Sequence, residues 1–211
     1  MAQSTNHPNT QSRNVPRLVV LISGNGTNLQ AILDACADKT LPAAVVAVIS
    51  NRSDAYGLVR ASKAGVPSMI LPKTPDIDRR AYDSILAGYV TSHRPDYVIL
   101  AGWMRILTSA FLDRFPNRVI NLHPALPGAF PGAHGIERAY EAWQKGEIDH
   151  TGVMVHLVPD EGVDDGPVLG VQEIAFQAGE SLEAFEERVH AVEHILLVET
   201  LRKVISEGKE K

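Results

Sequence analysis

Short apolar runs alternate with segments of helical period along most of this sequence. The runs are nearly continuous in Val, Ile and Leu, which is typical of strands that are buried on both faces. Strands that alternate with helical segments predict an α/β fold, with a Rossmann-like, mostly parallel twisted sheet and helices on both of its faces. The predicted strands are residues 18–22, 45–49, 69–71, 97–100 and 119–122.

Two segments between these strands carry apolar residues at helical spacing. We expect both apolar stripes to face the core, and we assign them no chemistry. The stripes consist of Leu29, Ile32, Leu33 and Cys36 in the first segment and of Tyr82, Ile85, Leu86 and Tyr89 in the second.

The pattern changes after residue 123. A loop rich in Pro and Gly, residues 124–135, precedes a predicted helix at 137–144. Two more predicted strands, 153–158 and 168–175, lead to a last helix that starts at Ser181. Because ligands of open parallel sheets bind beyond the carboxyl ends of the strands, we expect the functional residues in the loops that follow strands.

The chain has 211 residues, enough to bury one hydrophobic core. We expect a single folded domain at 17–205, a flexible polar tail at 1–16 and a frayed charged end at 206–211. The tail has no apolar stretch, so it does not resemble a secretory signal, and nothing in the composition suggests a membrane span.

Charge and cysteine content exclude some classes of function. The net charge of -5 and the pI of about 5.9 argue against nucleic-acid binding, which normally depends on a basic face. A single cysteine, Cys36, can form neither a disulfide within one chain nor a cysteine-based zinc site. The single cysteine fits a protein of a reducing, cytoplasmic compartment.

The first predicted strand leads into Ser-Gly-Asn-Gly-Thr-Asn at residues 23–28, and a helical segment follows. Exposed amide groups at the start of a helix favour an anion, so this loop predicts a phosphate cradle. A plain turn with Thr27 or Asn28 as N-cap is the alternative. The loop lacks the lysine of a P-loop, and Leu29 stands where a dinucleotide motif needs a small residue.

Asn121 and His123 stand at the end of the fifth predicted strand, just before Pro124. Residues two apart on a strand face the same side, so the two side chains should project together. An amide beside an imidazole can hold the oxyanion that forms when a carbonyl carbon is attacked. Alternatively, both side chains satisfy backbone groups at a strand end.

A carboxylate would be needed to orient the imidazole and to assist proton transfer. Residues 160–167 contain four acidic residues in a loop between two predicted strands. The same loop could be a solvated turn, and the residues alone do not select one carboxylate.

Four motifs together resemble the glycinamide ribonucleotide formyltransferases, in the order of that family. They lie at residues 21–30, 100–107, 121–126 and 164–167. The resemblance extends from about Arg17 to the last helix and implies the formyltransferase fold.

The resemblance implies a catalytic triad of Asn121, His123 and Asp164. The amine of glycinamide ribonucleotide would attack the formyl carbon of 10-formyltetrahydrofolate, with no metal involved. Asn121 and a protonated His123 would hold the tetrahedral oxyanion, and Asp164 would pair with the imidazole.

The resemblance also implies binding residues for both substrates. Gly26, Thr27 and Asn28 match the phosphate cradle, and Glu193 matches a carboxylate that holds the nucleotide. The folate would meet Asn121 together with Arg79, Met104, Arg105, Ile106 and Leu107. Arg79 and Glu193 could instead be surface charges, and residues 104–107 could be an ordinary apolar helix entry.

The sequence departs from the family at two places. Leu126-Pro127-Gly128 replaces the usual Leu-Leu-Pro, so we expect the 124–135 loop to differ in shape from that of the family. The acidic loop is one residue longer than in some members, and we choose Asp164 over Asp165 from its spacing to the Gly-Pro pair at 166–167.

Parts of this pattern also occur in proteins of other functions. Methionyl-tRNA formyltransferase and formyltetrahydrofolate hydrolase share the triad, but we expect them to carry an additional domain. Sugar-nucleotide formyltransferases share it too, but the cradle favours a monophosphate. The His-Ala-Val-Glu-His sequence at 190–194 fits an inverted zinc peptidase motif. A nucleotide-binding module without catalysis is a further alternative. We expect small-molecule partners, no nucleic acid or membrane, and a monomer or homodimer.

Overall fold

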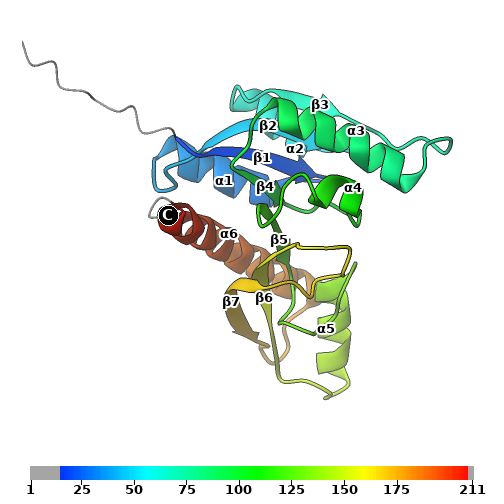
Figure 1. Cartoon of the computed structure of the whole chain (residues 1–211). Helices are drawn as coiled ribbons and strands as arrows, with labels where there is room; N and C mark the ends of the chain where they lie inside the picture. The colour runs from blue at the N-terminus through cyan, green and yellow to red at the C-terminus, as the bar shows by residue number, and fades with distance from the viewer. Residues whose placement is uncertain (1–14, 209–211) are drawn as a thin grey trace, which may run out of the picture.

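The computed structural model describes residues 15–208 and contains one seven-stranded sheet with the order β3-β2-β1-β4-β5-β6-β7 (Figure 1). The first five strands run parallel, and β6 and β7 continue the sheet in antiparallel fashion. The strands are β1 (Arg17–Ile22), β2 (Ala44–Ser50), β3 (Ser68–Ile70), β4 (Tyr97–Leu100), β5 (Val119–His123), β6 (His150–Leu157) and β7 (Val168–Ala175).

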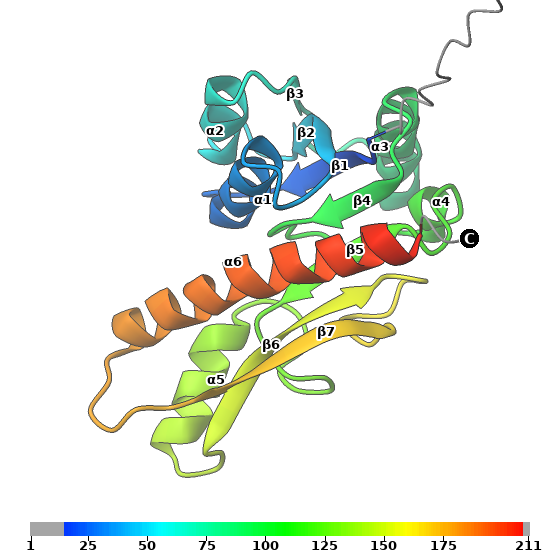
Figure 2. The same cartoon turned by 90° about the vertical axis from the view of Figure 1, so that its left-hand side faces the viewer.

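Helices cover both faces of the sheet. One face carries α1 (Thr27–Ala37), α2 (Gly57–Lys63), α5 (Gly135–Gln144) and α6 (Leu182–Glu207). The other carries α3 (Arg79–Ser92) and α4 (Ser109–Leu112). Figure 2 shows α6 running along the sheet below α1, with α3 and α4 on the far side of β4.

The two faces each have a core because alternate residues of β1 point in opposite directions. Leu18, Val20 and Ile22 pack against the α1 and α6 side, whereas Val19 and Leu21 pack against α3 and α4. All five side chains are fully buried. The continuous apolar run in the sequence is thus explained by a strand with helices on both sides, and the predicted α/β fold is confirmed.

One predicted apolar stripe is wrong in part. On α3, Tyr82 and Leu86 are buried as expected, but Ile85 and Tyr89 are 43% and 42% exposed. The buried face of α3 instead includes Asp83, whose carboxylate accepts a hydrogen bond from the Thr108 N–H at 2.7 Å. This bond allows a charged residue to occupy a core position. On α1, Leu29, Ile32 and Leu33 are buried and Cys36 is half-buried.

The ends of the domain differ slightly from the expected boundaries. The Pro16 carbonyl already accepts a hydrogen bond from Ala44 N–H at 2.8 Å, and α6 continues past residue 205 to Glu207. Most of the predicted tail, residues 1–14, and the last three residues of the predicted frayed end, 209–211, lie outside the described residues. Among residues 15–208, every helix is too short or too polar to cross a membrane.

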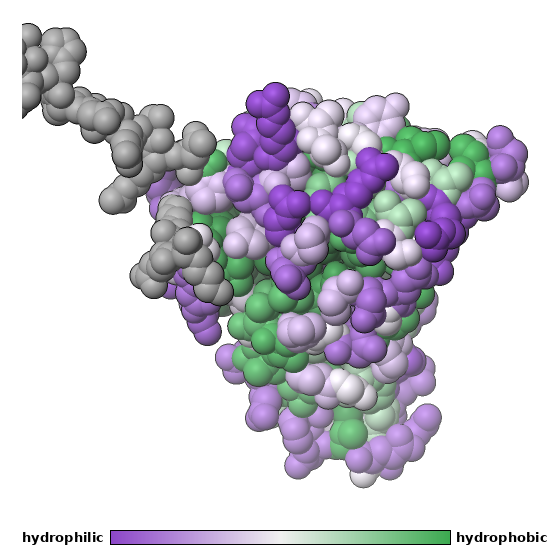
Figure 3. Space-filling model, in the orientation of Figure 1, coloured by the Kyte–Doolittle hydropathy of each residue, from purple (hydrophilic) through white to green (hydrophobic). Residues whose placement is uncertain are grey.

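Some apolar side chains remain exposed at the β7 edge of the sheet. Val168, Val171 and Ile195 are 45%, 48% and 61% exposed. Figure 3 shows hydrophobic surface in the part of the molecule where α6 and β7 lie.

Candidate active site

The carboxyl ends of β1, β4 and β5 bring the predicted motifs to one edge of the sheet. Strand pairing aligns Leu21 with Leu100, and Leu100 with Asn121. Beyond these positions, Ser23 N–H donates to the Gly102 carbonyl, and Met104 N–H donates to Ser23 Oγ at 2.9 Å. The loop after β1 is therefore attached directly to the loop after β4.

Asp164 connects the side chains that project from the end of β5. Its Oδ2 lies 3.2 Å from His123 Nδ1, and its Oδ1 accepts a hydrogen bond from Asn121 Nδ2 at 3.0 Å. Gly132 N–H donates to Oδ2 at 2.8 Å. An amide, an imidazole and a carboxylate from three distant segments thus meet at one point, where the 124–135 loop contributes a backbone donor.

The acidic loop delivers Asp164, and not Asp165, to this cluster. The Asp164 side chain is 12% exposed, whereas Asp165 is an exposed residue. Gly166 packs so closely on the Leu157 carbonyl that an added Cβ would lie 1.9 Å from its oxygen. This contact fixes the loop against β6 and explains why glycine follows the two aspartates.

Burial and neighbouring groups set the protonation states in the cluster. Burial alone would raise the pKa of Asp164, but the nearby His156 and His123 imidazoles and the hydrogen bond from Gly132 N–H outweigh it, so that its pKa lies below 3.8. Burial lowers the pKa of His123 below 6.5, although the Asp164 carboxylate opposes this shift. His123 is therefore mainly neutral at pH 7 in the free protein, and the protonated His123 expected opposite the oxyanion would form only during the reaction.

The tautomer of His123 follows from its neighbours. An ionised Asp164 can only accept, so His123 Nδ1 carries the hydrogen that faces it. His123 Nε2 is then unprotonated, and it is buried without a hydrogen-bond partner in the described part of the chain. A buried, unsatisfied basic nitrogen at a strand end indicates a place where a substrate proton can be received.

His156 is a fourth member of the cluster that our sequence interpretation missed. Strand pairing places it opposite Asn121, and its Nε2 lies 3.1 Å from Asn121 Nδ2 and 3.5 Å from Asp164 Oδ1. Its Nδ1 donates to the Leu157 carbonyl at 2.8 Å, which leaves Nε2 to accept from the Asn121 amide. Both hydrogens of Asn121 Nδ2 are thereby directed inward, to His156 and Asp164.

The predicted phosphate cradle forms the start of α1. Gly26, in the left-handed region at φ 73°, is the N-cap, so neither Thr27 nor Asn28 has that role. The cap has no side-chain hydrogen bond, which leaves the first amide groups of the helix available to an anion. Arg60 supports the loop by donating to both the carbonyl and the side chain of Asn25.

Glu193 reaches the cradle from α6. It is 4% exposed and accepts hydrogen bonds from Asn28 Nδ2 at 3.1 Å and from His190 Nδ1 at 2.8 Å. The bond to Glu193 raises the pKa of His190 above 6.5. Two further atoms nearby, Asn28 Oδ1 and His194 Nε2, are buried with no partner within residues 15–208. Glu193 is therefore part of a buried polar group and not a surface charge.

His190, Glu193 and His194 do not assemble a metal centre in this geometry. Within the described residues, no group of three or more His, Cys, Asp or Glu side chains is arranged to hold a metal ion. His190 bonds to Glu193, and Glu193 in turn accepts a hydrogen bond from Asn28 of the cradle. In this geometry Glu193 therefore connects α6 to the loop after β1.

The residues predicted to meet folate lie at the neighbouring loop, but they do not form one surface. Arg79 Nε donates to the Ile106 carbonyl at 3.2 Å, and the Arg105 guanidinium lies 5.0 Å from the centre of the Tyr82 ring. Met104 and Ile106 are 70% and 46% exposed. The side chain of Leu107 is buried in the core on the α3 side.

Glu161 attaches the acidic loop to the same region. Its Oε1 accepts a hydrogen bond from Ser109 N–H at 3.0 Å, and its Oε2 lies 3.5 Å from Arg79. The loop that carries Asp164 is therefore adjacent to the exposed apolar side chains Met104 and Ile106.

We expect Gly26→Ala to lower the free energy of unfolding by about 2–4 kcal/mol, because φ 73° is strained for alanine and the backbone is overpacked. An added Cβ would lie 2.7 Å from the Gly57 Cα. Gly24→Ala is the matched control, since its Cβ would have no neighbour within 4 Å, and it should change stability by less than about 0.5 kcal/mol. Denaturant unfolding of both variants tests this, and equal losses would contradict it.

Comparisons with known proteins agree with this arrangement. A family model described as formyl transferase matches residues 16–201. The phosphoribosylglycinamide formyltransferase of Schizosaccharomyces pombe is 48% identical over 207 residues, which cover 92% of this chain and 100% of that protein. Its counterpart in Escherichia coli is 42% identical over 179 residues, with coverage of 85% and 82%.

The structural comparison gives the same result. The crystal structure of glycinamide ribonucleotide transformylase 1 from Symbiobacterium toebii matches with a TM-score of 0.85 and 40% identity, covering 92% of this chain and 89% of that one. The residues that the family model matches, 16–201, include the whole sheet and the loops that form the site. The chain therefore belongs to the formyl transferase family, among the phosphoribosylglycinamide formyltransferases.

Proposed function

We propose that this enzyme transfers the formyl group of 10-formyltetrahydrofolate to the amine of 5'-phosphoribosylglycinamide, a step of purine biosynthesis. The observation that carries the proposal is the cluster of Asn121, His123 and Asp164 at the same sheet edge as the helix start at Gly26. The reaction forms a bond between the amine nitrogen and the formyl carbon, and breaks the bond from that carbon to the folate nitrogen.

His123 carries the proton in this mechanism. Its unprotonated Nε2 receives the proton that the amine loses when it attacks the formyl carbon. The imidazolium formed is stabilised by the Asp164 carboxylate 3.2 Å from Nδ1. It first donates a hydrogen bond to the oxyanion and then returns the proton to the departing folate nitrogen, so that proton and charge balance over the reaction.

Asn121 holds the oxyanion of the tetrahedral intermediate. Because both amide hydrogens are directed to His156 and Asp164 in the free protein, one of them must turn to the substrate oxygen when it arrives. We assign this role to the amide hydrogen that bonds to His156, since the other bond, to Asp164, keeps the carboxylate oriented. An oxyanion donor of this kind contributes roughly 2.7–4 kcal/mol to lowering the barrier.

The ribonucleotide binds at the start of α1. The backbone amides of Gly26, Thr27 and Asn28 hold its phosphate at the positive end of the helix. Glu193 accepts from the polar groups of the substrate, and the unsatisfied Asn28 Oδ1 provides a further acceptor.

The folate lies along the loop after β4. Exposed Met104 and Ile106 provide apolar surface for its ring system, and Arg79 and Arg105 lie beside them. Leu107 acts through its backbone, because its side chain is in the core. Chemistry of this type needs no metal, and we propose that the enzyme works without one, in the cytoplasm, as a monomer or homodimer.

A transfer assay tests the proposal. The purified chain is mixed with 10-formyltetrahydrofolate and 5'-phosphoribosylglycinamide, and absorbance follows release of the deformylated folate. We expect turnover only when the ribonucleotide is present. Equal folate release without it would indicate a hydrolase, and no turnover with either mixture would contradict the proposed reaction.

A further inference from the structure

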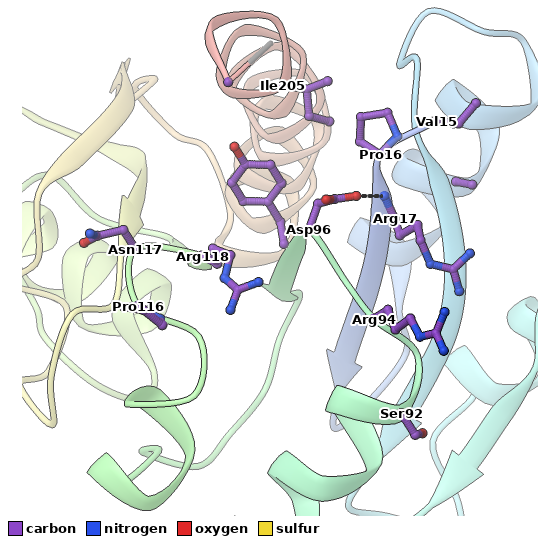
Figure 4. A pocket seen from close by; sticks show the side chains of 13 residues that line it. Val15, Pro16, Arg17, Ser92, Arg94, Asp96, Pro116, Asn117, Arg118 and Ile205 are labelled. Carbon is purple, nitrogen blue, oxygen red and sulfur yellow. Dashed lines mark hydrogen bonds between the residues drawn. The ribbon is translucent and has the colours of Figure 1, made fainter. Parts of the chain in front are cut away.

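A hollow of about 1160 Å³ lies at the end of the sheet opposite the active site. Figure 4 shows its lining residues, which come from the amino ends of β1 and β4, from the loop before β5 and from the C-terminal end of α6. Because the catalytic loops follow the carboxyl ends of the same parallel strands, the length of the strands separates the two places. The proposed transfer reaction does not use this hollow.

The hollow is cationic although the chain is acidic overall. Arg17, Arg94 and Arg118 line it, and Asp96 is the one acidic residue of its lining. Asp96 is itself engaged, since its Oδ2 accepts a hydrogen bond from Arg17 N–H at 2.7 Å, drawn as a dashed line in Figure 4. A local excess of positive charge in a protein of net charge -5 calls for a specific explanation.

Structural roles account for only part of this excess. Arg17 donates through Nε and Nη2 to the His93 carbonyl at the end of α3, and Arg118 Nη2 donates to the Arg114 carbonyl. Both side chains thus satisfy backbone groups. Arg94 is exposed, and its side chain makes neither a hydrogen bond nor an ion pair with any described residue.

No carboxylate within residues 15–208 neutralises the three guanidinium groups. None of them lies within 4.0 Å of an Asp or Glu oxygen, and Arg17 Nη1 and Arg118 Nε keep free hydrogens. The planar guanidinium fork binds two oxygens of a phosphate group through paired hydrogen bonds. Because three such cations line the hollow, they favour a ligand with several negative charges, such as one that bears phosphates, over a carboxylic acid of single charge.

The rest of the lining suits an organic group. Pro16, Pro116 and Ile205 provide apolar walls. Tyr97 also lines the hollow, and its hydroxyl makes no hydrogen bond to a described residue. The volume of about 1160 Å³ is slightly above the usual range of sites for organic ligands and far exceeds that of one phosphate ion. We propose that the hollow binds an organic polyphosphate, with Arg94, Arg17 and Arg118 on its phosphates and Tyr97 against its organic part.

Calorimetric titration of the full-length chain with adenosine triphosphate tests the proposal. We expect one molecule to bind, and Arg94→Ala to weaken its binding about tenfold or more, because a charge-assisted hydrogen bond is lost. Arg202→Ala is the matched control, since Arg202 is exposed and does not line the hollow. It removes the same charge and should leave the affinity within about twofold.

The possible outcomes separate the hollow from the phosphate cradle of the active site. If Arg94→Ala leaves the affinity for adenosine triphosphate unchanged, the probe binds elsewhere and the proposal is overturned. Absence of binding at millimolar concentration would also overturn it. Inorganic tripolyphosphate is the second probe, and we expect it to bind more weakly than adenosine triphosphate. Equal affinity would overturn the assignment of an organic ligand, whereas formyl transfer should be unchanged in Arg94→Ala.

Discussion

Asp164→Asn is expected to lower kcat by roughly 10³-fold, within the range of general acid–base contributions, while leaving the fold intact. The amide can occupy the same space but carries no charge to stabilise the His123 imidazolium. It could also present its NH₂ group to His123 Nδ1, which would favour the wrong tautomer. Steady-state kinetics with circular dichroism of the purified variant measures both effects.

The same variant should change the titration of His123. The Asp164 carboxylate raises the pKa of the imidazole against the lowering effect of burial, so removing the charge should move the pKa still further below 6.5. Proton NMR of the imidazole over pH 4–8 measures this shift. A pKa that rises in Asp164→Asn would contradict the proposed pairing.

Asp165→Asn is the matched control for this prediction. It makes the same chemical change at the adjacent position, but Asp165 is exposed and forms no ion pair with a described residue. We expect its kcat to stay within about threefold of the wild type, as for surface substitutions away from special features. An inactive Asp165→Asn with an active Asp164→Asn would show that the wrong carboxylate was assigned.

The strands of the sheet could be predicted from the sequence because they are buried on both faces. Residues 18–22 and 168–175 were predicted as strands, and β1 and β7 begin or end within one residue of those limits. The short helices α2 and α4 were not predicted, since four to seven residues carry too little apolar period to be recognised. The antiparallel pairing of β6 was equally hidden, because direction is set by tertiary contacts.

Only part of the site could be predicted from the sequence, because tertiary contacts also position some of its residues. Asn121 and His123 are two residues apart on one strand, so local geometry alone suggested that they act together. His156 is 35 residues from Asn121 and meets it only through the antiparallel register of β5 and β6. Without that register, a histidine inside an apolar strand gives no signal that separates it from an ordinary core residue.

The charge of His123 could not be predicted from its neighbours in sequence. The resemblance implies an imidazolium opposite the oxyanion, but in the free protein the side chain is only 4% exposed, and burial favours the neutral form more strongly than the Asp164 carboxylate favours the charged one. The depressed pKa means that the neutral form predominates above it and that the charged form appears only as the pH falls below it. This order makes His123 a proton acceptor at the start of the reaction.

His123→Ala is expected to lower kcat by roughly 10²–10⁴-fold, because the proton acceptor and one oxyanion donor are both removed. His123→Gln separates these two roles, since glutamine can donate a hydrogen bond to the oxyanion but cannot take up the amine proton. We expect the kcat of His123→Gln to exceed that of His123→Ala by no more than about tenfold. This gain is part of what one oxyanion donor contributes.

The comparison of the two variants decides which role dominates. Activity of His123→Gln near the wild-type level would show that donation alone suffices and that the amine proton leaves by another route. Activity of His123→Ala within tenfold of wild type would remove His123 from the mechanism altogether. Added imidazole should partly restore His123→Ala, because a free base can enter the space left by the side chain, and it should not affect Asp164→Asn, in which the imidazole is already present.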